Sequence, residues 1–110
     1  MLGAIIGDIV SSRYEFANTH TTDFELFTPY NNFTDDTICT IAVADAILQN
    51  KSFKDSLLYW YRKYPSPMGA YGGRFGQWVR SANPTTLSIA FFKKGITIIF
   101  FCPFVFYCQF

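Results

Sequence analysis

The pattern of hydrophobic and polar positions predicts a chain of helices. Residues 2–12 are small and apolar on most faces, and their two glycines lower helix propensity, so contacts with other segments must hold this helix. Residues 34–49 carry apolar side chains nearly all round, which indicates a central, buried helix. A third helix over residues 53–64 has an apolar stripe with helical spacing, which we expect to face the core: Phe53, Leu57, Trp60, Tyr61 and Tyr64.

Capping and breaker residues set the predicted ends of these helices. Thr34 is suited to cap the second helix, because its hydroxyl can accept a bond from a free backbone N–H. Ser52 and Asp55 resemble a capping box at the start of the third helix, and Pro65 ends that helix. A short fourth helix follows a glycine-rich loop and is expected to place three apolar residues on one face: Phe75, Trp78 and Val79. The predicted fold class is all-α.

Two stretches lie outside the helical pattern. Residues 13–33 lack a sustained period, and a connection of this length is usually functional or mobile. The last part of the chain, residues 85–110, holds seven of the 13 phenylalanines and a run of strand-like residues. We therefore divide the chain into a helical domain at residues 1–84 and an apolar tail at residues 85–110 whose structure the pattern does not define.

Length and composition favour one small folded domain. The 110 residues are 50% hydrophobic and 20% aromatic, so wholesale disorder is not expected. All eight acidic residues lie at or before Asp55, and six basic residues follow it without any acidic one. These six charges form no dense cluster, so nucleic acid is not an expected partner. The longest uncharged run, residues 95–110, is too short to span a bilayer.

Cysteine usage and the N-terminus indicate a cytoplasmic protein. The spacing of Cys39, Cys102 and Cys108 matches neither a disulfide framework nor a zinc site. Cys39 lies inside the apolar second helix, where a cysteine usually behaves as a small buried side chain. The N-terminus has no basic region, and Asp8 interrupts its apolar run, so a signal peptide is not expected.

The segment Thr34-Asp35-Asp36-Thr37 places four oxygen-bearing side chains at the start of the second helix. Its two carboxylates fall in the first turn, where the positive end of the helix dipole favours negative charge, and this alone explains an acidic first turn. The same oxygens also suit a hard cation such as Mg²⁺. Both interpretations remain open from these residues. Asp8, a carboxylate in an otherwise apolar helix, belongs either at the surface or at a site.

Four segments occur in an order and spacing that together are specific: Gly3-Ala4-Ile5-Ile6-Gly7-Asp8, Ser12-Arg13-Tyr14-Glu15, Phe33-Thr34-Asp35-Asp36-Thr37 and Gly69-Ala70-Tyr71-Gly72-Gly73-Arg74-Phe75. In these segments, which span roughly residues 1–84, the chain resembles the ADP-ribosylglycohydrolase family. The resemblance implies the N-terminal part of an all-α bundle with a dinuclear Mg²⁺ or Mn²⁺ site in a cleft between helices.

The resemblance also implies a function and a set of site residues. The implied reaction is metal-dependent hydrolysis of the N- or O-glycosidic bond between ADP-ribose and an acceptor, in an ADP-ribosylated protein or a small conjugate. Thr34, Asp35 and Asp36 match the N-terminal metal ligands of the family. Glu15 matches a glutamate beside the metals and forms the expected catalytic set with the two aspartates, whereas Asp8 is expected to support the site or to pack. Three loop glycines are expected to border the ADP-ribose: Gly69, Gly72 and Gly73.

The sequence departs from the family in two respects. Ser11 and Ser12 stand where members usually have a glycine–serine pair, and no Asp-x-Asp-Thr segment follows residue 84 to supply the remaining metal ligands. We therefore expect impaired hydrolysis by this chain alone. The alternative is a non-catalytic helical module that binds ADP-ribose or a protein partner, or the product of a disrupted reading frame.

Overall fold

The described part of the chain is helical. A computed structural model of the protein describes residues 1–17 and 19–81. Four α-helices and one 3₁₀ helix form there, and these residues contain no β-strand, which confirms the predicted all-α class for this part of the chain. The predicted tail at residues 85–110 lies outside the described residues. The helices are α1 (Leu2–Ser11), η1 (Ser12–Tyr14), α2 (Asp35–Leu48), α3 (Phe53–Lys63) and α4 (Gly73–Arg80).

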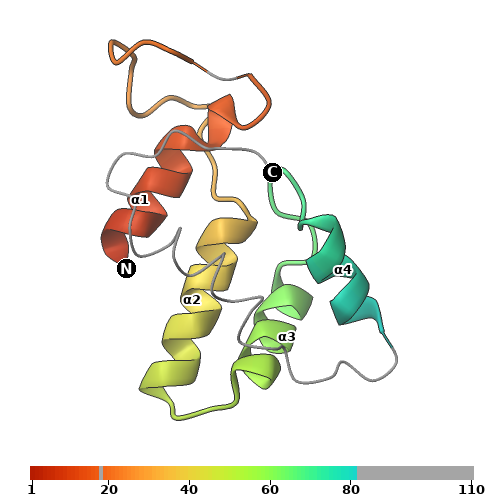
Figure 1. Cartoon of the computed structure of the whole chain (residues 1–110). Helices are drawn as coiled ribbons and strands as arrows, with labels where there is room; N and C mark the ends of the chain where they lie inside the picture. Colours follow the sequence, from red (N-terminus) through yellow and green to blue (C-terminus); the bar gives the residue numbers. More distant parts are fainter. Residues whose placement is uncertain (18, 82–110) are drawn as a thin grey trace.

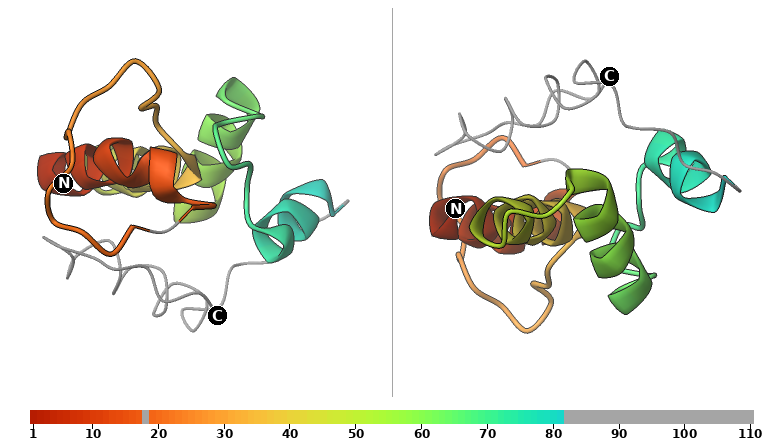
Figure 2. Two further views of the ribbon diagram at one scale, coloured as in Figure 1. Left: turned by 90° about the horizontal axis from the view of Figure 1, so that it is seen from above. Right: turned by 90° about the horizontal axis from the view of Figure 1, so that it is seen from below.

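Helix α2 lies at the centre of the arrangement. It packs against α1 on one side and against α3 on the other, and it runs antiparallel to α1 (Figure 1). The buried hydrophobic residues come from these contacts and are mostly small: Ile38, Ala42, Val43 and Ala46 on α2, and Leu57 on α3. Helix α4 lies on the side of α3 that faces away from α1 in all three views (Figures 1 and 2).

The start of α2 follows the sequence prediction closely. Thr34 is the N-cap residue in an extended conformation, and its side chain accepts a hydrogen bond from the backbone N–H of Asp36 at 3.2 Å. Asp35 and Asp36 occupy the first turn. Only part of the predicted capping box of α3 is confirmed. Ser52 is the N-cap residue of α3, but its side chain makes no capping hydrogen bond.

The predicted burial of the helices is only partly confirmed. In the apolar stripe of α3, Leu57 is buried, but Phe53 and Tyr64 at the ends of the stripe are 46% and 37% exposed. In α2 the last turn is exposed, with Leu48 at 76%, so the prediction of a helix buried all round is wrong there. No residue of α1 is buried in the described structure, and Leu2 is 71% exposed. The described helices are too few to cover every apolar face that the pattern marks.

Aromatic rings attach α4 to the rest of the bundle. The ring of Tyr61 on α3 lies 4.9 Å from that of Tyr71 and 6.2 Å from that of Phe75, measured between centroids. The rings of Phe75 and Trp78 on α4 also contact each other in a tilted arrangement, with centroids 5.6 Å apart. As predicted, the apolar residues of α4 share the packed side of the helix, whereas Arg74 and Arg80 are exposed.

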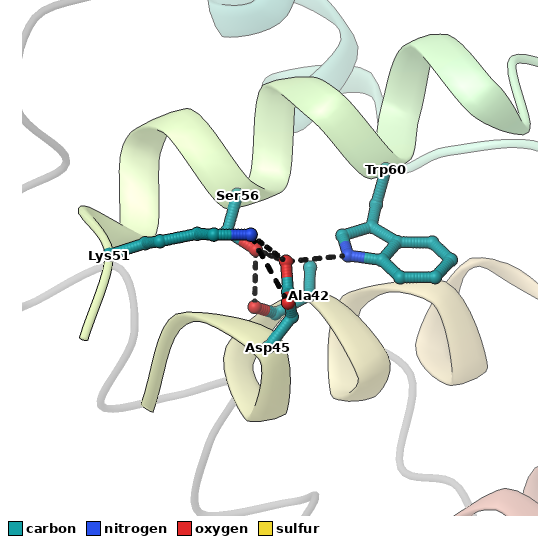
Figure 3. A network of polar contacts seen from close by, with 5 residues as sticks. All are labelled: Ala42, Asp45, Lys51, Ser56 and Trp60. Atoms are coloured by element: carbon teal, nitrogen blue, oxygen red, sulfur yellow. Dashed lines mark hydrogen bonds and ion pairs between the residues drawn. The ribbon is translucent and has the colours of Figure 1, made fainter. Parts of the chain in front are cut away.

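A polar network joins the C-terminal part of α2 to α3 (Figure 3). The Asp45 carboxylate accepts hydrogen bonds from the Ser56 hydroxyl at 3.1 Å and from the Trp60 indole N–H at 3.2 Å, and it pairs with the Lys51 ammonium at 3.4 Å. Ser56 also reaches the carbonyl oxygen of Ala42 at 2.7 Å, which brings the two helices into close contact. Asp45 therefore serves as a structural connection between the two helices.

Replacement of the Asp45 carboxylate is expected to change how the free energy of unfolding depends on pH. Burial alone favours the neutral form, but the hydrogen bonds from Trp60 and Ser56 and the charge of Lys51 outweigh it and lower the pKa of Asp45. A lowered pKa stabilises the fold above the ordinary value, and this stabilisation is lost as pH falls through the folded value. We expect Asp45→Asn to be less stable than wild type at pH 7, and the difference to shrink as the pH falls below the ordinary pKa of an aspartate. Denaturant unfolding at neutral and acid pH checks this, and a gap that persists in acid contradicts it.

None of the helices within residues 1–17 and 19–81 combines the length and the apolar composition that crossing a membrane requires.

Candidate metal site

The candidate site lies at the N-terminal end of α2 and is built around Asp8 of α1. The Asp8 carboxylate accepts three hydrogen bonds: from the Thr34 backbone N–H at 2.9 Å, from the Thr34 hydroxyl at 2.5 Å and from the Thr37 hydroxyl at 2.5 Å. Both threonines are nearly fully buried, at 4% and 5% exposed. The carboxylate therefore fixes the start of α2 against α1. Asp8 is half-buried and bonded to the residues of the candidate site, so it is not a free surface carboxylate.

The hydrogen bonds of Thr34 leave one position on its hydroxyl oxygen for a ligand. A hydroxyl has one proton to donate and two lone pairs that can accept. The proton goes to Asp8, and one lone pair accepts the N–H of Asp36. The remaining lone pair has no hydrogen-bond partner within the described residues. The Thr34 hydroxyl oxygen therefore keeps one acceptor lone pair that these two bonds do not use while Thr34 caps the helix.

Asp35 and Asp36 form the acidic part of the site. Asp35 is half-buried and its carboxylate accepts a long hydrogen bond, 3.4 Å, from the backbone N–H of Gly72. Burial and the neighbouring charge of Asp36 raise the pKa of Asp35 to about 6, with a smaller contribution from Glu15. Asp36 is exposed as a residue, yet desolvation of its carboxyl group and the charge of Asp8 raise its pKa as well.

Glu15 follows η1 and extends toward the loop between α3 and α4. One carboxylate oxygen, Oε2, is buried and has no hydrogen-bond partner among the described residues. Burial raises the pKa of Glu15, and the charges of Asp8 and Asp36 add to the effect. An unpaired buried acceptor costs about 1–3 kcal/mol, more if it is charged. The position of this oxygen is therefore unfavourable unless a proton or a cation neutralises it.

The raised pKa of Asp35 predicts how the stability of the metal-free chain depends on pH. Because the folded chain holds this proton more tightly than the unfolded chain, stability falls as the pH rises from the ordinary aspartate value, and the loss is complete above a pH of about 6. After allowance for solvent screening of a half-exposed group, we expect about 1 kcal/mol of stability to be lost between pH 4 and pH 6.5 in EDTA. Asp35→Asn removes this loss while it retains an acceptor for Gly72. A variant whose unfolding free energy follows the wild-type pH profile contradicts the assignment.

The structure brings together most of the residues that the sequence marked. Thr34, Asp35 and Asp36 share the first turn of α2, and the charge of Glu15 acts on that of Asp35. Of the loop glycines, Gly69 lies against the Glu15 carboxylate and Gly72 bonds Asp35, whereas Gly73 opens α4. Among the described residues, however, no three His, Cys, Asp or Glu side chains are arranged to hold a metal by themselves.

Two contacts at the site escaped the sequence analysis. The first is the bond of Thr37 to Asp8. The spacing of Thr34 and Thr37, three residues apart in one helical turn, was the available signal, because it places both hydroxyls on one face. The second is the contact between Gly69 and Glu15, for which a glycine-rich loop gives no sequence signal. Cys39 is half-buried rather than buried, and burial raises the pKa of its thiol to about 12, which disfavours the reactive thiolate form.

Comparison of the chain with protein-family models, with curated proteins and with solved structures found no match.

Proposed function

We propose that this chain is the N-terminal part of an ADP-ribosylglycohydrolase-type bundle and takes part in the metal-dependent hydrolysis of an ADP-ribosyl bond. The bond is the N- or O-glycosidic link between ADP-ribose and an acceptor, in a modified protein or a small conjugate. The support is the resemblance of the four segments together with the arrangement of Asp8, Glu15 and the Thr34–Thr37 turn. We propose a cytoplasmic location on the composition alone.

The observation that carries the proposal is the buried, unpaired Oε2 of Glu15 beside a pair of acidic residues. Burial first, and neighbouring like charges second, raise the pKa values of Asp35 and Asp36, so the charged forms of these carboxylates destabilise the fold. In native proteins each such unpaired group deserves an explanation, and an ion is one of the common ones. A cation bound beside Glu15 supplies the positive charge that its unpaired carboxylate oxygen lacks.

The donor set fits Mg²⁺ or Mn²⁺. All the candidate atoms are oxygens, namely one hydroxyl of Thr34 with a spare lone pair and the carboxylates of Asp35 and Asp36. Hard divalent cations prefer such ligands and commonly retain several waters. When bound, the metal supplies Lewis-acid polarisation of the substrate oxygens and orients a water for attack at C1″ of the ribose.

The roles of the chain's own residues follow from their positions. Thr34, Asp35 and Asp36 would hold the metal. Their orientation is set at the start of α2, because hydrogen bonds to Asp8 fix the position of Thr34. Glu15, whose pKa is raised by burial and by the charges of Asp8 and Asp36, is placed to exchange a proton at its carboxylate, as a general acid or base does. The loop with Gly69, Gly72 and Gly73 borders the same end of α2 and is the expected wall for the ADP-ribose.

The described carboxylates supply only part of a ligand shell. This favours weak hydrolysis by the chain alone and keeps the second candidate, a non-catalytic helical module that binds ADP-ribose or a protein. The two candidates differ in whether ADP-ribose binding depends on a metal.

Calorimetric titration of ADP-ribose into the chain, once with Mg²⁺ and once with EDTA, distinguishes the two candidates. The hydrolase-type site predicts binding in Mg²⁺ and none in EDTA. Equal binding in both buffers supports the non-catalytic module. Asp45→Asn is the matched control, because Asp45 lies on the same helix and is paired with Lys51 away from the site. Binding that is lost in Asp45→Asn but kept in Asp35→Asn contradicts the proposed location.

A further inference from the structure

Gly69 has two properties that set it apart from the other glycines of its loop. Its φ of +79° lies in the left-handed region, and a Cβ at this position would overlap both oxygens of the Glu15 carboxylate and lie 2.6 Å from its Cδ. At Gly72 and Gly73, by contrast, a Cβ would meet no atom within 4 Å and φ is not positive. Only at residue 69 of this loop does the absence of a side chain create room for another residue.

Backbone conformation by itself already favours a glycine at position 69, because a φ of +79° is one that L side chains rarely adopt. The next residue, Ala70, also has a positive φ, of +62°, so the left-handed conformation is not peculiar to residue 69. What distinguishes residue 69 is the carboxylate packed against its Cα. That carboxylate is the end of a flexible side chain, so a methyl group at position 69 displaces Glu15 in addition to straining the backbone.

The loop that carries Gly69 is attached to the start of α2 on both sides of Gly69. Met68 forms an isolated parallel bridge with Thr34, and the N–H of Gly72 bonds the Asp35 carboxylate. The backbone at residue 69 therefore has a fixed position relative to Thr34 and Asp35. A side chain that packs on this backbone acquires a fixed position relative to the same residues.

We propose that Gly69 is a positioning residue for Glu15: its bare Cα is the surface that lets the Glu15 carboxylate lie beside the acidic turn of α2. A side chain at residue 69 moves Glu15 into solvent, and the divalent cation then binds more weakly. The positioning rests on the contact itself, whereas its effect on the cation also rests on the proposed function.

The positioning is tested without metal by carbon NMR of the full chain. Glu15 and Glu25 are the only glutamates in the sequence, so labelling glutamate with ¹³C at the carboxyl carbon gives two resonances, which Glu15→Gln assigns. Glu25 is exposed and serves as the internal reference for a hydrated carboxyl group. In EDTA we expect Gly69→Ala to move the Glu15 resonance to the position of Glu25, and Gly73→Ala to leave it unchanged. An unmoved resonance in Gly69→Ala overturns the proposal.

The effect on the cation is tested with a double-variant cycle and Mn²⁺ alone as the probe. We expect Gly69→Ala and Glu15→Ala each to weaken Mn²⁺ binding about tenfold, and the double variant to lose no more than either one, because both remove the same carboxylate. Losses that multiply to about a hundredfold mean that residue 69 acts independently of Glu15 and overturn this part. If wild type itself binds no Mn²⁺, the proposed function fails, while the carbon resonance still decides the positioning.

Discussion

Removal of the Asp8 carboxylate is expected to produce the largest loss of stability of any single change at the site. Asp8→Ala leaves three donors without their acceptor: the backbone N–H of Thr34 and the hydroxyls of Thr34 and Thr37. Because both threonines are buried, water does not replace the lost bonds freely. The relief of repulsion with Glu15 and Asp36 offsets part of the cost. We expect a net loss of about 3 kcal/mol in the free energy of unfolding.

Asp8→Asn is the matched control for this prediction. The amide keeps the shape and one acceptor oxygen, but its NH₂ group faces a donor, so we expect about half of the loss seen with Asp8→Ala. Denaturant unfolding in EDTA at pH 7 measures both variants. Two variants as stable as wild type contradict the view that Asp8 fixes the start of α2. Because small domains have only about 5–15 kcal/mol of total stability, Asp8→Ala is best studied at low temperature.

The second large effect is expected in Asp35→Asn/Asp36→Asn, which separates binding from stability. Without metal, the double variant should be more stable than wild type at pH 7, because the mutual repulsion and the desolvation of the two carboxylates disappear. With Mn²⁺ at a concentration a hundredfold above its Kd, wild type should gain about 2.7 kcal/mol, and the double variant should gain nothing. Opposite signs in the two buffers are characteristic of a ligand site that function maintains at the expense of stability.

Thermal unfolding of both proteins in EDTA and in Mn²⁺ makes this comparison. Asp45→Asn again serves as the control, since its carboxylate lies on the same helix outside the site and should retain the full gain from Mn²⁺. A double variant that gains as much stability from Mn²⁺ as wild type shows that the cation binds elsewhere. A double variant that is less stable than wild type in EDTA shows that the acidic turn serves only to cap α2.

The helices were predictable because local patterns determine them. The bounds of α2 differ by one residue at each end from the predicted range, and α3 begins as predicted and ends one residue early, since Thr34 and Pro65 act through their own chemistry within one turn. Burial was less predictable. An apolar stripe such as that of α3 marks a face that prefers to be covered, but which segment covers it depends on the packing of distant parts of the chain. Phe53 and Tyr64 therefore remain exposed in the described structure.

In the candidate site, too, some features are set by neighbouring residues in the sequence and others by contacts between residues far apart in it. The cap by Thr34 and the positions of Asp35 and Asp36 follow from neighbours in sequence. The bonds of Asp8 to Thr34 and Thr37 join residues 26 and 29 positions apart, so only the fold reveals them. The contact between Glu15 and Gly69 is more distant still and depends on where a loop between two helices is attached.

The central claim, that the acidic turn of α2 binds a divalent cation, is tested most directly by paramagnetic broadening. Substoichiometric Mn²⁺ is added to the ¹⁵N-labelled chain, and the backbone amide signals are followed residue by residue. The account predicts selective broadening at Thr34, Asp35, Asp36 and the adjacent loop at Gly72, and its reversal by excess Mg²⁺. Signals that stay sharp there, or that broaden equally beside exposed carboxylates such as Asp55, contradict the account.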